Sequence, residues 1–266
     1  MKKITYKFMA LFFLLSACAK VPISNRKQMN LMPESEMLSM SLTSYKDFLA
    51  QNPPVASTDP NSQLVKKVGG KISVAVEQYL KQNGFADRVK DFKWEFNLVN
   101  NKEVNAWCMP GGKVVVYSGL LPVTQDESSL ACVLGHEIAH AVARHGNERM
   151  SQEMMAQMGG VALDVALANK SAQTRSIFMS AYGAGAEVGV MLPYSRLHET
   201  EADKLGLVFM AMAGYNPNTA VAFWERMAKT GGSKPPEIMS THPSDQTRIS
   251  NIKAYLPTAM KYYKPS

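Results

Sequence analysis

The chain has 266 residues, 46% of them hydrophobic, so it is long enough for one large domain or two small ones and is not wholly disordered. Its formal charge of +7 falls to +4 when Lys2, Lys3 and Lys7 of an expected leader are removed from the 29 basic residues, against 22 acidic ones. So small an excess does not indicate a nucleic-acid-binding protein, and we expect no nucleic acid partner.

The N-terminus has the pattern of a targeting segment. A basic stretch precedes an apolar run, residues 8–15, that is too short to span a bilayer. The run leads into Leu-Ser-Ala-Cys, which resembles a bacterial lipobox. We therefore predict a lipoprotein signal peptide over residues 1–17 and lipidation of Cys18; the alternative is an ordinary signal peptide with a nearby cysteine. Because Ala19 follows instead of aspartate, a resemblance to enterobacterial sorting signals indicates the periplasmic face of the outer membrane.

Two helices are expected ahead of the first strand. Residues 18–33 are predicted to be a lipidated tether, and residues 34–50 a first helix. Asp59 followed by Pro60 is typical of a helix N-terminus, because the carboxylate can cap the helix and proline is favoured at its first position. The second helix should end at Asn83, which precedes a glycine.

A small sheet is predicted in the middle of the chain. Alternating or β-branched residues predict strands over residues 92–99, 105–109 and 113–117, and Pro-Gly-Gly between the last two predicts a hairpin turn. From residue 150 onward the chain reads as almost wholly helical. We therefore predict an α+β fold that is predominantly helical.

Residues 136–140 spell His-Glu-Ile-Ala-His within a helical stretch that Asp126 or Ser128 could cap. Residues four apart on a helix share a face, so His136 and His140 can bind one metal ion, with Glu137 placed to accept a proton from water. Gly135 leaves room for substrate or a neighbouring backbone. The alternative is a helix with two partly buried histidines.

A catalytic zinc site needs a third protein ligand. The extended motif H-E-x-x-H-x-x-G-x-x-H fails here, and His145, one residue out of register, is expected at the surface or at a helix end. Glu199 and Asp203 share a helix face downstream, so Glu199 could bind zinc while Asp203 orients a ligand histidine. His198 is a rival ligand, and a solvated charged helix face is the alternative for this stretch.

Four blocks carry a resemblance to a known family: Asn105-Ala106 through Pro110-Gly111-Gly112-Lys113; His136 to His140; Ser195-Arg196 with Glu199, Ala202 and Asp203; and Thr241-His242-Pro243 followed by Arg248-Ile249. The chain resembles the gluzincin zinc peptidases of the HtpX, CAAX prenyl endopeptidase and Oma type, and within them the soluble periplasmic lipoprotein branch that is BepA- and LoiP-like. The resemblance covers about residues 60–256. It implies a single peptidase domain over residues 34–266, with a small sheet packed on the H-E-x-x-H helix.

The resemblance also implies roles for further residues. Asn105 and Ala106 would border the cleft and pair with substrate backbone. His242 would approach the metal, as a latch or as a group that steadies the oxyanion; a satisfied core histidine is the alternative. For Arg248, an oxyanion role and a structural salt bridge stay equally open. The expected cofactor is one zinc ion.

The implied function is that of a zinc endopeptidase of the bacterial cell envelope, lipid-anchored to the membrane, that cuts misfolded or stalled envelope proteins. Glu137 would act as the general base beside the zinc. The alternative is a chaperone-like or latched binding lipoprotein that uses the same groove with little proteolysis. Two points stay open: Cys108 and Cys132 could form a disulfide or be buried thiols, and residues 160–190 could form a lid or ordinary helical packing.

Overall fold

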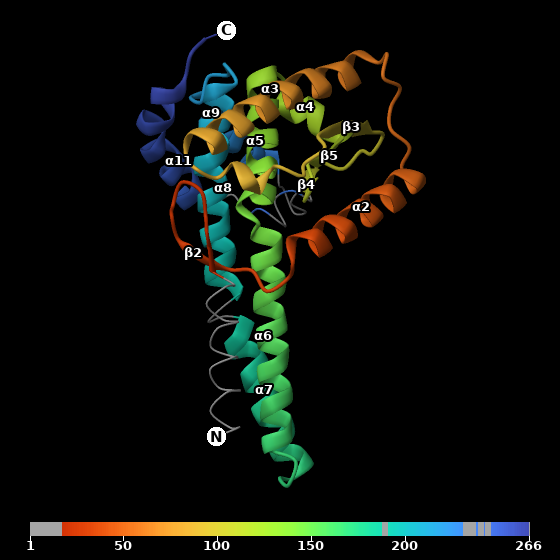
Figure 1. Ribbon diagram of the computed structural model, residues 1–266, viewed down its shortest axis with the longest axis vertical. Coiled ribbons are helices and arrows are strands. Elements are labelled where there is room, and N and C mark those ends of the chain that lie inside the picture. The colour runs from red at the N-terminus through yellow and green to blue at the C-terminus, as the bar shows by residue number, and fades with distance from the viewer. Residues whose placement is uncertain (1–17, 188–190, 231–237, 239–241, 243–245, 266) are drawn as a thin grey trace. The chain divides into compact units, whose positions relative to one another are not determined.

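The computed structural model describes residues 18–187, 191–230, 238, 242 and 246–265 (Figure 1). The chain divides into two compact units, Met1–Glu34 with Arg144–His198 and Ser35–Ala143 with Glu199–Ser266, called below the first and the second unit. The predicted signal peptide lies outside the described residues, and the predicted domain boundaries stay a prediction. No helix in the described ranges is both long and apolar enough to cross a bilayer.

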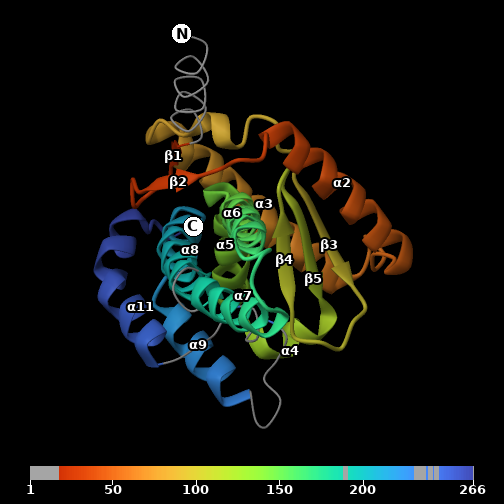
Figure 2. The same cartoon turned by 90° about the horizontal axis from the view of Figure 1, so that it is seen from below.

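The second unit contains the sheet and most of the helices, as Figure 2 shows. Its elements are α2 (Glu34–Gln51), α3 (Pro60–Gln82), β3 (Glu95–Val99), β4 (Ala106–Met109), β5 (Lys113–Tyr117), α4 (Leu121–Thr124), α5 (Glu127–Ala143), α9 (Thr219–Thr230) and α11 (Gln246–Ala259), with short 3-10 turns. Helix α8 (Leu192–Met212) begins in the first unit and continues in the second. The predicted class, α+β with helix dominant, is confirmed.

The helix starts predicted from capping residues are confirmed. Asp59 accepts hydrogen bonds from the backbone amides of Asn61 and Ser62 at 2.8 and 3.1 Å, and α3 begins at Pro60. Of the two candidate caps for α5, Asp126 fills the role, because its carboxylate accepts from the backbone amide of Ser129 at 2.7 Å. These carboxylates satisfy amides that have no partner within the helix.

The sheet has the strand order β3-β5-β4, with β3 parallel and β4 antiparallel to β5. Gly111 and Gly112 make the predicted turn between β4 and β5 with φ of 90° and 78°, a conformation that favours glycine. The first strand begins at Glu95, three residues later than predicted. The ring of Trp94 instead lies against Gly112, where a Cβ atom would be only 2.7 Å away. Among the described residues, β4 pairs with β5 on one side alone, so it is an edge strand of this sheet.

Helices cover both faces of this sheet (Figure 2). On one face, Tyr45 and Phe48 of α2 pack edge-on against Trp107 of β4. On the other face, Phe96 of β3 fits against Gly69 of α3, where a Cβ atom would lie 2.2 Å from the ring. Helix α5 contacts β4 and α3. The sheet thus holds α5, the helix with the H-E-x-x-H motif, from one side.

The first unit contains β1 (Cys18–Lys20), β2 (Lys27–Met29), α6 (His145–Ala166) and α7 (Ala172–Ala186). Within residues 18–33, whose role as a lipidated tether stays a prediction, β1 and β2 form an antiparallel hairpin. The reason is a set of polar contacts from α6. Glu148 binds Arg26 at 2.6 Å and Gln28 at 3.0 Å, and Ser151 accepts a hydrogen bond from the amide of Leu31.

Candidate metal centre

Helix α5 presents His136 and His140 on one face. They lie one turn apart, and their Nε2 atoms are 3.1 Å from each other. His136 is buried, and His140 is largely buried. Two imidazole nitrogens held this closely by helical spacing are arranged to share one ion.

Helix α8 brings Glu199 to the same point. One carboxylate oxygen lies 3.3 Å from Nε2 of His136, and the other lies 3.3 Å from Nε2 of His140. The approach depends on two glycines where α5 and α8 meet. A Cβ atom on Gly135 would lie 2.8 Å from the carbonyl oxygen of Gly206, and one on Gly206 would lie 2.8 Å from the amide nitrogen of His136. Gly135 therefore admits a neighbouring backbone, one of the two roles predicted for it.

His242 supplies a fourth donor. Its Nδ1 lies 2.8 Å from Glu199 and 3.3 Å from Nε2 of His136. One donor atom from each of His136, His140, Glu199 and His242 lies within 4.8 Å of the others. A zinc ion bound tetrahedrally at about 2.0 Å has ligands about 3.3 Å apart. The spacing and the nitrogen and oxygen donors of this cluster therefore fit zinc.

Asp203 and Arg248 support the cluster from behind. Asp203 lies one helical turn after Glu199 and contacts Nδ1 of His136 at 3.0 Å, on the side of the ring away from the donor cluster. Arg248 pairs with both oxygens of Asp203 at 2.7 and 2.8 Å, and its guanidinium stacks 3.6 Å above the ring of Trp224. This geometry favours the salt-bridge role for Arg248, since both of its contacts with Asp203 are buried.

The charges of the cluster shift its pKa values. Burial alone would raise the pKa of Glu199, but hydrogen bonds with three histidines hold it well below its usual range. Burial and the Arg248 cation oppose protonation of His136, yet hydrogen bonds with Asp203 and Glu199 outweigh them and raise its pKa to about 9. Burial holds the pKa of His140 well below its usual range although a hydrogen bond with Glu199 opposes that shift, so this ring stays neutral, as a metal-binding imidazole must be.

Glu137 lies beside the cluster without belonging to it. Its Oε1 is 3.7 Å from Nε2 of His242. Burial raises the pKa of Glu137, and the neighbouring His242 and His136 moderate that rise. Oε1 of Glu137 is buried and accepts no hydrogen bond from the described residues, whereas Oε2 of Glu199 lies 3.3 Å from both His136 Nε2 and the Arg248 guanidinium. A buried carboxylate oxygen with no donor of its own, beside this donor set, fits a group that takes a proton from a water held at the ion.

The structure does not assign a role to the predicted substrate-binding residues or to the cysteines. Ala106 is buried in β4, and Asn105 directly precedes it; the side-chain oxygen of Asn105 accepts from the amide of Ala106 at 2.9 Å. Strand β4 packs on α5, the helix that carries Glu137. Burial, and then the charge of the Glu137 carboxylate, raise the pKa of Cys108 in β4. Cys108 and Cys132 are both free thiols. The roles of Asn105 and Ala106, and the lipidation of Cys18 in β1, stay predictions.

Two histidines differ from expectation. His145 begins α6, as a helix-end residue should, but it is 3% exposed instead of lying at the surface, and it stacks on His198 at 4.3 Å. His198, the rival ligand, contacts Glu148 at 2.9 Å within the first unit. The apolar stack and the carboxylate explain why both histidines are buried away from solvent.

Sequence reasoning also missed two residues of this site. Trp224 of α9 forms the surface on which Arg248 lies, and Gly206 permits the contact between α5 and α8. Neither carries a chemical signal in the sequence. The only hint for Gly206 was its place in the same helix as Glu199.

The chain is similar to known proteins. The profile described as peptidase family M48 matches residues 70–256. The mitochondrial metalloendopeptidase OMA1 of Schizosaccharomyces pombe is 35% identical over 90% of this chain and 66% of its own length. OMA1 of Saccharomyces cerevisiae is 30% identical over 99% of this chain and 78% of its own length. The beta-barrel assembly-enhancing protease of Escherichia coli K12 is 33% identical over 60% of this chain and 34% of its own length.

These findings bear on two predictions. The predicted enzyme class, a metallopeptidase, is confirmed by the family profile and by the relatives named metalloendopeptidases. The predicted location in a bacterial cell envelope is contradicted, because relatives from fungi, a plant and cattle that match the chain are named as mitochondrial proteins. That prediction rested on the short lipobox-like pattern and on the resemblance to the periplasmic branch of the family. The chain spans only about a third of the bacterial relatives' length, and about two thirds of the S. pombe relative's.

Proposed function

The chain belongs to peptidase family M48, and from that premise we propose that it is a zinc-dependent endopeptidase whose substrates are polypeptides in extended form. The observation that carries the proposal is the donor cluster of His136, His140 and Glu199 with the carboxylate of Glu137 beside it. Two histidines and a carboxylate are one of the donor sets that hold catalytic zinc in peptidases.

When bound, zinc supplies a Lewis acid that activates water and polarises the scissile carbonyl. The protein's own groups do the rest. Glu137 accepts the proton of the attacking water at its free Oε1 and passes it to the leaving amine. Its raised pKa suits this exchange, since a base works best when its pKa approaches the working pH. Asp203, fixed by Arg248, holds His136 in one tautomer with Nε2 directed at the ion.

The edge strand β4 supports an extended substrate. A polypeptide can pair with the free edge of a sheet only if its own backbone groups are unpaired. Strand β4 packs on α5, and Glu137 lies close enough to affect Cys108 of that strand. We therefore expect unfolded or misassembled proteins as substrates, with Asn105 and Ala106 at the start of the pairing strand.

His242 supports a second candidate, a latched state with little proteolysis. Its Nδ1 lies 3.3 Å from His136 and 2.8 Å from Glu199, so it would serve as a fourth protein donor at the position that a catalytic zinc site leaves open for water. A site with four protein donors resembles a structural zinc site. In this reading the chain binds extended segments and cuts only after His242 moves aside.

One experiment tests both candidates. The full chain, Glu137→Gln and His242→Ala are compared for zinc content and for casein cleavage. An endopeptidase should bind one zinc, cut casein and lose about a hundredfold or more of its activity in Glu137→Gln with zinc retained. A rise in cleavage in His242→Ala identifies the latch, whereas a fall identifies a group that assists the reaction.

Two results would refute the endopeptidase. One is near-wild-type cleavage by Glu137→Gln. The other is a wild-type protein that binds no zinc, which would return His136 and His140 to the role of ordinary buried histidines.

A further inference from the structure

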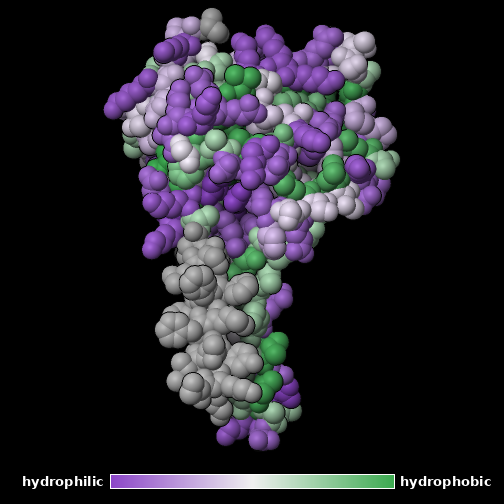
Figure 3. Space-filling model, viewed as in Figure 1, coloured by the Kyte–Doolittle hydropathy of each residue, from purple (hydrophilic) through white to green (hydrophobic). Residues whose placement is uncertain are grey.

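Helix α9 contacts both α5, which carries the candidate metal ligand His136, and α11, which carries Arg248. Trp224 of α9 is 1% exposed. The Cζ atom of Arg248 lies 3.6 Å from the centre of the indole, and the ring of His136 lies 5.9 Å from it in an edge-on arrangement. Figure 3 shows mainly hydrophilic side chains over α11, whereas Phe223 and Trp224 of α9 are buried. One aromatic ring inside the second unit thus contacts both a metal ligand and the cation behind it.

Arg248 lies between two carboxylates that have different tasks. Its Nε and Nη2 donate to Asp203 at 2.8 and 2.7 Å, so one side of the guanidinium holds both oxygens of that residue. Its Nη1 donates to the carbonyl of His242 at 3.1 Å and lies 3.3 Å from Oε2 of Glu199. A small rotation of the guanidinium would bring Nη1 onto Glu199. The two carboxylates therefore compete for one cation.

The outcome of this competition matters for the metal site. A cation paired with Glu199 would repel the metal ion and neutralise the charge that attracts it. A cation paired with Asp203 instead fixes the carboxylate that contacts Nδ1 of His136, on the side of the ring away from the donor cluster. The site can hold an ion well only if Arg248 prefers Asp203.

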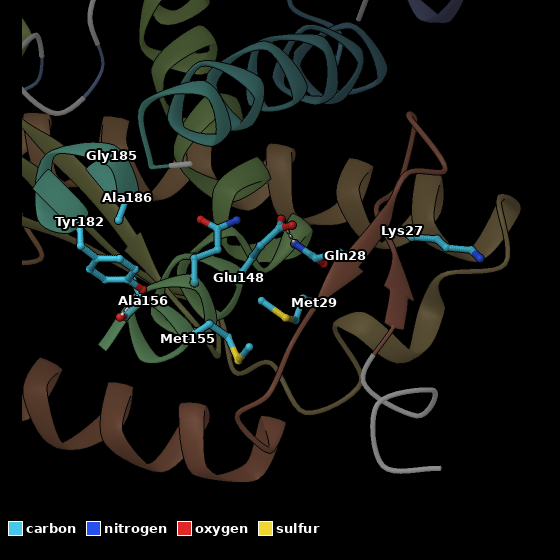
Figure 4. Close-up of a pocket in the computed structure, with 10 residues that line it drawn as sticks. Lys27, Gln28, Met29, Glu148, Met155, Ala156, Tyr182, Gly185 and Ala186 are labelled. Atoms are coloured by element: carbon cyan, nitrogen blue, oxygen red, sulfur yellow. Dashed lines mark hydrogen bonds between the residues drawn. The ribbon is translucent and has the colours of Figure 1, made fainter. Parts of the chain in front are cut away.

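Hydrogen bonds from several donors can hold a buried carboxylate, as Glu148 of the first unit shows. Figure 4 shows Gln28 reaching Glu148, and both Arg26 and Gln28 donate to it. In the described part of the chain, Asp203 pairs with one guanidinium, that of Arg248, and this group has a second carboxylate within reach. The orientation of Arg248 therefore has to be fixed by a group other than the carboxylates.

We propose that Trp224 is a positioning residue of the metal site, whose flat face fixes the plane of the Arg248 guanidinium so that it neutralises Asp203 and leaves Glu199 free to bind the metal. The inference rests on the zinc endopeptidase proposed above. A guanidinium stacks flat on an aromatic face, which restricts its tilt and still leaves its N–H groups free to donate in the plane. Trp224 acts through Arg248 and is not a catalytic residue.

Two variants of Trp224 separate the flat ring from the space that it fills. Trp224→Met keeps an adaptable apolar side chain without a face, whereas Trp224→Phe keeps a face. Phe223→Met is the matched control, because Phe223 is the preceding residue of α9 and is also fully buried. In chelator competition with the full chain, Trp224→Met should bind zinc about tenfold more weakly, and the other two variants should stay within about threefold of the wild type.

A measurement without metal reports on Arg248 itself. In protein with isotope-labelled arginine, a guanidinium held in one plane gives separate NMR signals for its Nη1 and Nη2 protons, and their loss in Arg248→Gln assigns them. Trp224→Met should merge these signals, whereas Trp224→Phe and Phe223→Met should keep them apart. A ring that served only to fill space would leave the signals unchanged.

A change that keeps the shape of the side chain covers the case in which Trp224→Met does not fold. Fluorotryptophan has nearly the same shape as tryptophan, but fluorine withdraws charge from the face of the ring. It also replaces Trp94 and Trp107, so Trp224→Phe grown with the same analogue is the control. The analogue should weaken zinc binding of the wild type about twofold and leave that of the control unchanged.

Equal zinc affinities of Trp224→Met and Phe223→Met would overturn the proposal. So would a Trp224→Phe variant that binds zinc as weakly as Trp224→Met, because the volume of the indole would then matter and not its face. A wild-type chain that binds no zinc would refute the proposed function instead. The arginine signals would still decide whether Trp224 holds Arg248, because they are recorded without metal.

Discussion

The contact between α5 and α8 makes a sharp prediction for Gly206→Ala. The added Cβ would lie 2.8 Å from the amide nitrogen of His136, against an optimal approach of about 3.5 Å, so the helices must separate by about 0.7 Å. Overpacking of this kind costs about 1–3 kcal/mol, partly offset by about 1 kcal/mol of helix propensity gained from alanine. We expect a net loss of up to about 2 kcal/mol.

The same shift moves His136 away from Glu199 and Asp203, which lie on the helix that carries Gly206. Metal sites tolerate errors of only about 0.5 Å, so zinc affinity should fall about 10- to 100-fold. The assay is zinc competition with a chelator, together with thermal unfolding with and without the metal.

Gly70→Ala in α3 is the matched control. A Cβ atom there meets nothing within 4 Å, so this variant should gain up to about 1 kcal/mol and keep its zinc affinity. The reasoning is refuted if Gly206→Ala is as stable as Gly70→Ala and binds zinc as tightly as the wild type.

Three further predictions concern the ion pairs. Removing the cation in Arg248→Gln leaves Asp203 buried with His136 as its remaining described partner, so we expect a loss of about 3 kcal/mol in a denaturant titration; an unchanged midpoint would contradict the pairing. Asp203→Asn should weaken zinc binding about 10- to 100-fold in the chelator assay while leaving Glu137 in place, and an unchanged affinity would show that His136 needs no such support. For Glu148, burial is outweighed by hydrogen bonds from Arg26 and His198, which lower its pKa to about 2 from 4.5. The contribution of Glu148 to the free energy of unfolding is thus fully present above pH 4.5 and is lost as pH falls toward 2, by at most about 3 kcal/mol. Glu148→Gln should remove this part of the pH dependence of unfolding. A variant whose stability follows pH as the wild type does would count against the pairing.

Local patterns predicted the parts of the fold that local physics determines. The caps at Asp59 and Asp126 and the Pro-Gly-Gly turn depend on neighbouring residues alone. The closeness of His136 and His140 could be expected from the sequence, because helix geometry brings residues four apart onto one face. The same holds for Glu199 and Asp203.

Contacts between distant segments could not be predicted in this way. The hairpin of residues 18–29 exists because Glu148 binds Arg26 and Gln28, about 120 positions away. The burial of His145 depends on its stack with His198. The role of Arg248 stayed open because an arginine can pair with many carboxylates, and only the fold places it between Asp203 and Trp224.

The order of residues along the chain also decides when the metal centre can form during synthesis. His136, Glu137 and His140 emerge from the ribosome first, but Arg144–His198 must follow before Glu199 appears. His242 and Arg248 come later still. A nascent chain therefore carries the base long before it can hold the ion, and peptide-bond cleavage has to wait until the second unit is nearly complete.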